Sequence, residues 1–157
     1  MLSGESNGLL PLMLVVRILI FNTNKDKGRA GLSLAIAYFG ANGYCVNLPL
    51  NDTQFYDLVV EKEGKFYTVQ CKATGTLNNS ISLRNTGGTK GKVYDNVCNH
   101  SNLDYLFCID KNKNMFLIPV KDIIYSGNHN SICLMDKPIG KFSNKNCFDT
   151  YKYRVEI

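Results

Sequence analysis

The sequence lacks the features of secreted and membrane-spanning proteins. Its six cysteines are scattered singly with no CxxC pair, and several lie in apolar stretches such as YLFCID, which favours reduced core thiols over disulfides. The apolar stretch LLPLMLVVRILIF, residues 9–21, contains a proline and an arginine and is too short to span a bilayer. It also lacks the basic start and small-residue cleavage site of a signal peptide. We therefore expect an intracellular protein that is neither secreted nor inserted in a membrane.

Length and composition favour one folded domain. The 157 residues are 45% hydrophobic and 11% aromatic, which is enough for a core, and they contain no internal repeat or linker. We expect residues 1–21 to form an apolar extension and residues 22–157 a single domain, with its core at about 22–125. The net charge of +5 comes with no long acidic block, so an anionic partner such as nucleic acid is compatible with it.

Periodicity predicts one helix and several short strands. TNKD has the form of a capping box that begins at Thr23, and apolar residues then recur at helical spacing from Leu32 to Phe39. This pattern predicts a largely buried helix that Gly43 ends. Strands are expected in YCVNLPL, ISLRN, LDYLFCID, NMFLIPV and the alternating C-terminal YKYRVEI. A helix combined with several strands indicates an α/β or α+β domain.

Residues 56–72, YDLVVEKEGKFYTVQCK, read as a hairpin with three polar groups in an apolar setting. A turn centred on the EG pair places Asp57 opposite Gln70, and side-chain alternation places Lys72 on the same face. A carboxylate with nearby oxygen ligands can hold Mg²⁺ against a phosphate, and a lysine can stabilise developing negative charge. The alternative is structural: the acid ends a turn, the amide makes a cross-strand hydrogen bond and the lysine extends to solvent.

These residues resemble the motif of the PD-(D/E)XK nuclease superfamily, in the form of Asp57 followed by Gln70-Cys71-Lys72. The stretch KGRAGLSLAIAYFGANGYCVNLPLNDTQFYDLVV resembles the opening of the branch that includes intron-encoded homing endonucleases and archaeal Holliday-junction resolvases. The resemblance implies a restriction-endonuclease-like mixed sheet with a packed N-terminal helix. It also implies Asp57, Gln70 and the backbone carbonyl of Cys71 as ligands of Mg²⁺ or Mn²⁺. Lys72 is implied as the catalytic lysine.

Two positions depart from the family pattern. Many members carry Glu where this chain has Gln70, and many add a glutamate on the first helix, where this chain offers only Leu32 or Ser33. An amide still binds a hard cation through its oxygen, but the lost charge should weaken metal binding. Asp52 and Glu61 are nearby acids, and neither is expected to take the missing place.

Residues 84–92, RNTGGTKGK, are expected to form a Gly-rich basic loop. The segment carries three cations and no acid, and its glycines let the backbone approach phosphates. Both DNA contact and an ordinary solvated loop fit this composition. The candidate DNA contacts are Arg84, Gly87, Gly88, Lys90 and Lys92.

The preferred interpretation is a metal-dependent endonuclease that hydrolyses double-stranded DNA, most similar to an intron-type homing endonuclease. A junction-resolving nuclease is one alternative. A nucleic-acid-binding module that keeps the fold without catalysis is another, because the helix acid is missing and Gln70 is neutral. Cutting both strands needs two active sites and one small domain spans little duplex, so we expect a homo-oligomer, either a dimer or a tetramer.

Overall fold

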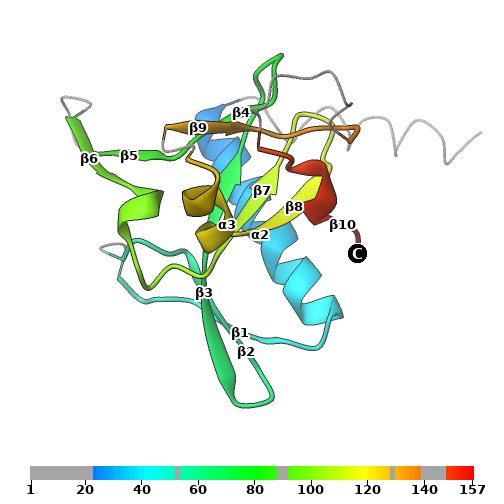
Figure 1. The fold of residues 1–157 in the computed structure, drawn as a ribbon. Coiled ribbons are helices and arrows are strands. Elements are labelled where there is room, and N and C mark those ends of the chain that lie inside the picture. Colours follow the sequence, from blue (N-terminus) through cyan, green and yellow to red (C-terminus); the bar gives the residue numbers. More distant parts are fainter. Residues whose placement is uncertain (1–22, 52–53, 88–91, 128–129, 139–147) are drawn as a thin grey trace, which may run out of the picture.

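A six-stranded mixed sheet forms the centre of the protein in the computed structural model, which describes residues 23–51, 54–87, 92–127, 130–138 and 148–157 (Figure 1). The strand order is β1-β2-β3-β7-β8-β10, and only β3 and β7 pair in parallel. The strands span Cys45–Asn47 (β1), Leu58–Lys62 (β2), Lys65–Ala73 (β3), Tyr105–Ile109 (β7), Met115–Pro119 (β8) and Arg154–Val155 (β10). The expected extension at residues 1–21 lies outside the described residues.

Two small sheets and two helices complete the described fold. The small sheets pair β4 (Ser80–Ser82) with β9 (Ser131–Cys133), and β5 (Arg84–Gly87) with β6 (Lys92–Asn96). The helices are α2 (Asn24–Ala41) and α3 (Val120–Tyr125), with 3₁₀ turns η1 (Val97–Asn99) and η2 (Tyr151–Tyr153). A mixed sheet with a packed N-terminal helix confirms the expected α+β class. Within the described part of the chain, no helix has the length and apolar character needed to cross a membrane.

The start and end of α2 follow the sequence signals. The Thr23 hydroxyl accepts a hydrogen bond of 3.1 Å from the backbone N–H of Asp26, as a cap requires. After the helix ends at Ala41, Gly43 takes a φ of 76°, a left-handed conformation that costs glycine little. The expectation of a largely buried helix is wrong. Because α2 covers one side of the sheet only, its fully buried stripe consists of Gly31, Ala35 and Phe39.

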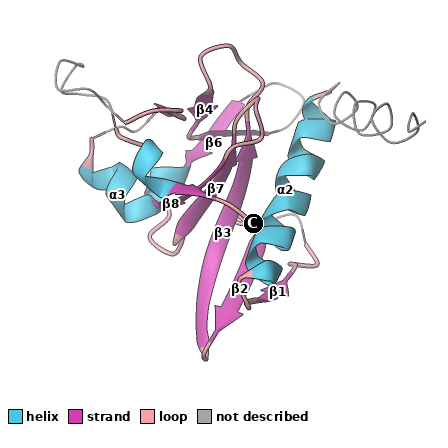
Figure 2. Ribbon diagram, turned by 90° about the vertical axis from the view of Figure 1, so that its right-hand side faces the viewer, coloured by secondary structure: helices cyan, strands magenta, loops and turns pink. Residues whose placement is uncertain are grey.

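The two faces of the sheet carry separate hydrophobic clusters. Phe39 of α2 packs with Val69 and Phe107 on one face. Cys108, Phe116 and other buried side chains on the opposite face pack with α3, η1 and the β4–β9 pair. Figure 2 shows the sheet between α2 on one side and α3 on the other. Polar side chains of β3 that point away from α2 therefore face the layer built from later parts of the chain.

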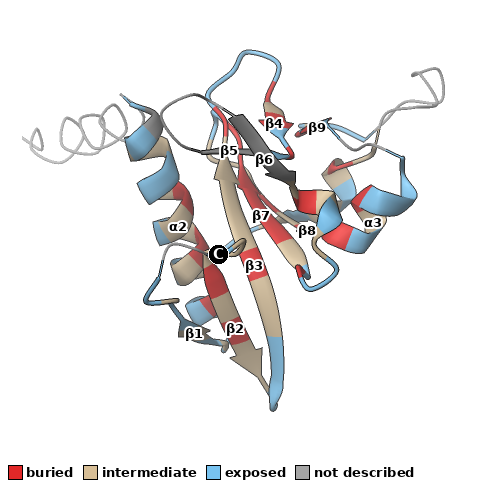
Figure 3. Ribbon diagram, turned by 90° about the vertical axis from the view of Figure 1, so that its left-hand side faces the viewer, coloured by how far each residue is buried: buried red, intermediate tan, exposed pale blue. Residues whose placement is uncertain are grey.

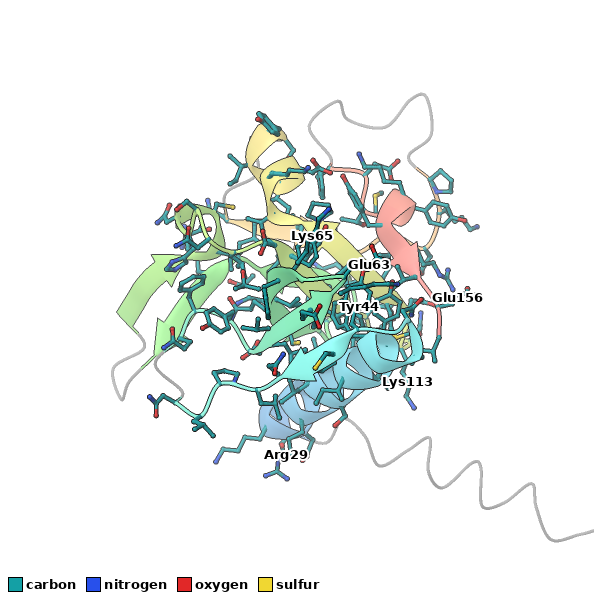
Figure 4. The ribbon with its side chains drawn as sticks, turned by 90° about the horizontal axis from the view of Figure 1, so that it is seen from below. Arg29, Tyr44, Glu63, Lys65, Lys113 and Glu156 are labelled. Atoms are coloured by element: carbon teal, nitrogen blue, oxygen red, sulfur yellow. The ribbon has the colours of Figure 1, made fainter. Side chains whose placement is uncertain are left out.

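The β2–β3 hairpin forms with the predicted turn and register. Glu63 and Gly64 occupy the turn with φ values of 55° and 75°, and Lys62 pairs with Lys65. Viewed from below, Glu63 and Lys65 mark the tip of the hairpin (Figure 4).

Several segments differ from the expected elements, and ISLRN, for example, divides between β4 and β5. The strand in NMFLIPV ends at Pro119, because Val120 already begins α3. The segment RNTGGTKGK is not a plain loop, since its two ends pair as strands β5 and β6. In YKYRVEI, only Arg154–Val155 is a strand, because residues 151–153 form the turn η2, in which Tyr153 N–H binds Thr150 O at 3.1 Å.

Candidate active site

Asp57 lies where β2 and β3 separate. The regular ladder ends with Leu58 opposite Val69. The N–H of Asp57 then donates a hydrogen bond of 2.9 Å to the Val69 carbonyl, one residue out of the register that would place Asp57 opposite Gln70. Two residues of one strand therefore face one residue of the other, as in a β-bulge. The expected direct opposition of Asp57 and Gln70 is thus corrected to an offset of one residue.

The Asp57 carboxylate bridges this gap to β3. Its Oδ2 accepts a hydrogen bond of 2.7 Å from the backbone N–H of Cys71. In a strand, the N–H and C=O of one residue point to the same side, so the Cys71 carbonyl lies on the same edge of β3 as the carboxylate. This arrangement places on one strand edge two of the three oxygens that the family resemblance implies as metal ligands.

Gln70 carries the third predicted oxygen. Val69 and Cys71 contact the cluster beneath α2, so the alternating side chain of Gln70 points to the other face of the sheet. Its Oε1 is buried and finds no hydrogen-bond partner among the described residues. A buried acceptor left without a partner costs about 1–3 kcal/mol. An amide oxygen of this kind fits a ligand for a hard divalent cation, which binds oxygen donors.

Lys72 shares the face of Gln70, two residues further along β3. Burial lowers the pKa of Lys72 from its ordinary value, while Cys108, its partner across the parallel pair, and Asp57 act in the opposite direction. Burial raises the pKa of the Cys108 thiol to about 12, so that thiol is neutral at physiological pH and the charge of Asp57 is the one that favours the Lys72 ammonium. Lys72 is thus a partly desolvated cation close enough to Asp57 to interact with it electrostatically.

The electrostatic balance at Asp57 opposes ionisation. Burial raises its pKa above the ordinary value, and the hydrogen bond from Cys71 and the charge of Lys72 only partly oppose this effect. A cation bound beside Asp57 would therefore stabilise its ionised carboxylate. A perturbed carboxylate beside a desolvated lysine and an unpartnered amide is a typical sign of a functional site.

Among the described residues, the other acid considered, Glu61, does not supply a second carboxylate. Glu61 accepts a hydrogen bond of 2.7 Å from the backbone N–H of Gly64 and so stabilises the hairpin turn. Asp52 lies outside the described residues. On α2, Ser33 is exposed and Leu32 packs on the hydrophobic cluster. No group of three His, Cys, Asp or Glu side chains that suits a metal exists in the part of the chain that the structure describes. A cation here would depend on one carboxylate and neutral oxygens.

The structure describes only part of the basic segment. Arg84 begins β5, and its guanidinium donates to Oδ1 of Asn130 at 2.8 and 3.2 Å. Gly87 pairs with Lys92 in the β5–β6 hairpin. Gly88 and Lys90 lie outside the described residues. The described ends of the segment therefore form a strand pair, and its first residue, Arg84, is bound to Asn130.

No sequence pattern indicates the stack between His100 and Phe55, which lies two residues before Asp57. The ring of Phe55 stacks on that of His100 with centroids 4.2 Å apart and planes 5° apart, and it meets Tyr56 edge-on at 5.3 Å. These contacts join the approach to Asp57 to the residue that follows η1. The two aromatic residues lie 45 positions apart in the chain, so no local pattern could have paired them.

Comparisons with known proteins agree on the fold. A family model described as PD-(D/E)XK endonuclease matches residues 22–154. The solved structure of a bacterial homing endonuclease, I-Ssp6803I, is similar with a TM-score of 0.61 and 19% sequence identity, over 85% of this chain and 89% of that chain. At this identity, the structural likeness speaks for the fold alone. A search among curated protein sequences gives no match.

Proposed function

Because the chain belongs to the PD-(D/E)XK endonuclease family, we propose that it is a metal-dependent endonuclease that hydrolyses phosphodiester bonds of double-stranded DNA, in the manner of a homing endonuclease. Its catalytic residues are Asp57, Gln70 and Lys72. The carboxylate of Asp57, the amide oxygen of Gln70 and the Cys71 carbonyl are the ligands of Mg²⁺ or Mn²⁺.

The observation that carries this proposal is the unpartnered Oε1 of Gln70. A purely structural glutamine in a sheet would satisfy its buried oxygen with a neighbouring N–H. Among the described residues, the Gln70 acceptor has no partner, and it lies on the face that also carries Lys72, next in sequence to Cys71, whose N–H binds the Asp57 carboxylate. A cation ligand is the role that accounts for both the missing hydrogen bond and the neighbouring carboxylate.

Each side chain then has a defined task. A divalent cation in this position supplies Lewis-acid activation of a phosphate oxygen or a water molecule. Asp57 provides the negative charge that holds the cation, and Gln70 and Cys71 provide neutral oxygens. Lys72, partly desolvated and close to Asp57, directs its ammonium group at the charge that develops on the phosphate.

We further propose that the β5–β6 hairpin contacts DNA phosphates. Arg84, Gly87, Gly88, Lys90 and Lys92 are the candidate residues. Two active sites are needed to cut both strands, so the working form is a homo-oligomer, a dimer or a tetramer.

The decisive experiment measures cleavage of supercoiled, linear and four-way-junction DNA in Mg²⁺ or Mn²⁺. We expect the parent to cut duplex DNA, and Asp57→Ala and Lys72→Ala to lose about 10²-fold or more of that activity while still binding DNA. Preferential cutting of the junction would instead favour a resolving nuclease. The enzyme proposal is wrong if the parent binds DNA without cutting any substrate and both variants bind equally well.

A non-catalytic DNA-binding module is the second candidate. The observation in its favour is that one carboxylate, Asp57, is left to attract a cation in the described site. Calorimetric titration of the parent with Mn²⁺ separates the two candidates, because a module without catalysis has no need of the cation. Binding that disappears in Asp57→Ala supports the enzyme.

A further inference from the structure

The edge of the sheet beyond Lys72 gathers three segments that are distant in the sequence. Strands β3 and β7 are parallel, so the residues that follow them emerge at the same edge. The Thr74 N–H binds the Ile109 carbonyl at 2.9 Å, and the Lys111 ammonium binds the Leu77 carbonyl at 3.3 Å. The first turns of α2 lie at the same edge, because the Lys27 side chain passes close to Gly75. A Cβ added at Gly75 would lie 2.9 Å from Cε of Lys27.

The loop after β3, residues 74–79, is held in one conformation by its own polar groups. The hydroxyls of Thr74 and Thr76 lie 2.9 Å apart, and the Thr76 hydroxyl accepts from the Ser80 N–H at 3.1 Å. Asn79 is only 7% exposed, takes a φ of 50°, and its carbonyl accepts from Leu134 N–H at 3.0 Å. A loop fixed in this way presents the same surface before and after a partner binds.

This fixed loop presents an apolar tip. Leu77 is 91% exposed, although the loop around it is anchored at both ends. Figure 3 shows the loop as mostly exposed at the end of the sheet, with the N-terminal turns of α2 at the same end. A single exposed leucine is ordinary on a protein surface, so its surroundings decide what it signifies.

The surroundings of Leu77 are cationic. Lys27 and Lys111 contact the loop itself, and the segment TGTLNN contains no acid. The carboxylate of Asp110 is fully buried and accepts from Asn112 and Asn114, so it does not lie at the surface beside Leu77. An apolar tip between cations suits an anionic partner with an apolar interior.

Duplex DNA has this chemistry, and the surface lies close to the candidate active site. Thr74 follows Lys72 by two residues, about 7 Å along a strand, which equals the rise of about two base pairs. Minor-groove-binding proteins place apolar side chains against base steps while their cations contact the adjacent phosphates. A duplex held at Asp57 and Lys72 therefore passes within reach of this edge.

We infer that Lys27, Leu77 and Lys111, together with the loop of residues 74–79, form a second DNA contact of this protein, here called the β3-end surface. Leu77 packs into the minor groove and the two lysines bind the phosphates beside it. The inference rests on the proposed activity on DNA, because it names a contact of that same substrate.

The test measures affinity for a mixed-sequence duplex of about 30 base pairs at several salt concentrations, in EDTA so that no strand is cut. We expect Leu77→Ser to weaken binding about 10-fold, because a leucine loses its burial. Lys27→Gln and Lys111→Gln should each lower the salt slope by about one. The matched controls are Phe66→Ser and Lys65→Gln at the hairpin tip, where Phe66 is also an exposed apolar residue. They should leave both quantities unchanged.

The outcomes separate this inference from the proposed activity. If the parent cuts DNA but the three variants bind like the parent, the β3-end surface is wrong and the activity stands. If the parent binds without cutting and the variants lose affinity, the activity is wrong and the surface stands. A parent with no affinity for the duplex overturns both. Thermal melts confirm folding, and if Lys27→Gln is unfolded, Leu77→Ser and Lys111→Gln decide the result.

Discussion

The backbone N–H of Cys71 donates its hydrogen bond to the side chain of Asp57, at 2.7 Å, and not to a strand carbonyl. This contact takes over where the β2–β3 ladder stops at Leu58 and Val69. The acid therefore has two roles, because it closes a break in the sheet and it presents a carboxylate beside Lys72. Its replacement affects stability and activity in opposite ways.

Asp57→Asn should remove cleavage but leave the metal-free protein at least as stable as the parent. Burial raises the pKa of Asp57, so its ionised form is disfavoured in the folded state. Its favourable contribution to stability is present below the unfolded pKa and is lost as the pH rises through the folded pKa. At neutral pH the charge is therefore a cost, which the amide avoids while it still accepts from Cys71. Thermal melts in EDTA from pH 4 to 8 check this.

The control for this prediction is the same melt with Mn²⁺ added. The parent should gain stability because the cation binds only the folded chain, whereas Asp57→Asn should gain little. A variant that is less stable than the parent in EDTA at pH 7 would contradict the assignment of a destabilising buried charge.

Gln70→Leu should stabilise the metal-free protein by about 1 kcal/mol, because an apolar group replaces a buried oxygen without a partner. Chemical denaturation in EDTA measures the change. The same variant should lose Mn²⁺ affinity in calorimetric titration. Unchanged Mn²⁺ binding would exclude the amide from the ligand set.

Gln70→Glu tests the same position by adding charge. A second carboxylate should tighten Mn²⁺ binding about 10-fold or more, since hard cations favour charged oxygen ligands. Cleavage of plasmid DNA then reports what the native amide does. A loss of cutting despite tighter binding would mean that the amide is tuned to this site, and a gain would mean that it weakens the metal pocket.

Phe39→Ala should destabilise the fold by about 3–5 kcal/mol without changing the chemistry of the site. The Phe39 ring is 1% exposed, lies 6.0 Å from that of Phe107 and joins α2 to the sheet face opposite Gln70. Denaturant unfolding measures the loss. The control Ala37→Ser changes an exposed position of the same helix and should stay within about 0.5 kcal/mol of the parent.

The parts predictable from the sequence are those set by neighbouring residues. The cap at Thr23, the helix end at Gly43 and the turn at Glu63 and Gly64 each depend on hydrogen bonds or φ angles within a few positions. This turn also determines the pairing register of β2 and β3 as far as Leu58. The electrostatic contact between Asp57 and Lys72 lies beyond that ladder, so it depends on the offset at Asp57 and not on the counted register alone.

The parts that were missed depend on tertiary contacts. Counting outward from the turn assumes an unbroken ladder, so it could not reveal the offset at Asp57, which exists because the side chain replaces a backbone partner. The alternation in YKYRVEI reads as a strand, but only Arg154–Val155 pairs with β8. Glycines made residues 84–92 look like a loop, although the ends of the segment pair across β5 and β6.

The stack of Phe55 on His100 should set how firmly Asp57 is held. Phe55 lies two residues before the acid, and the aromatic contact ties this approach to η1. Such a pair contributes about 0.5–1.5 kcal/mol, so Phe55→Ala should weaken Mn²⁺ binding by up to about 10-fold and lower the cleavage rate accordingly. His100→Phe keeps a flat ring in the stack and should retain both the Mn²⁺ affinity and the cleavage rate, whereas His100→Ala should resemble Phe55→Ala.

Calorimetry with Mn²⁺ and plasmid cleavage measure the two effects. If Phe55→Ala binds Mn²⁺ as tightly as the parent, the acid is positioned by its bond to Cys71 alone, and the aromatic pair serves only the packing of the face that carries Gln70.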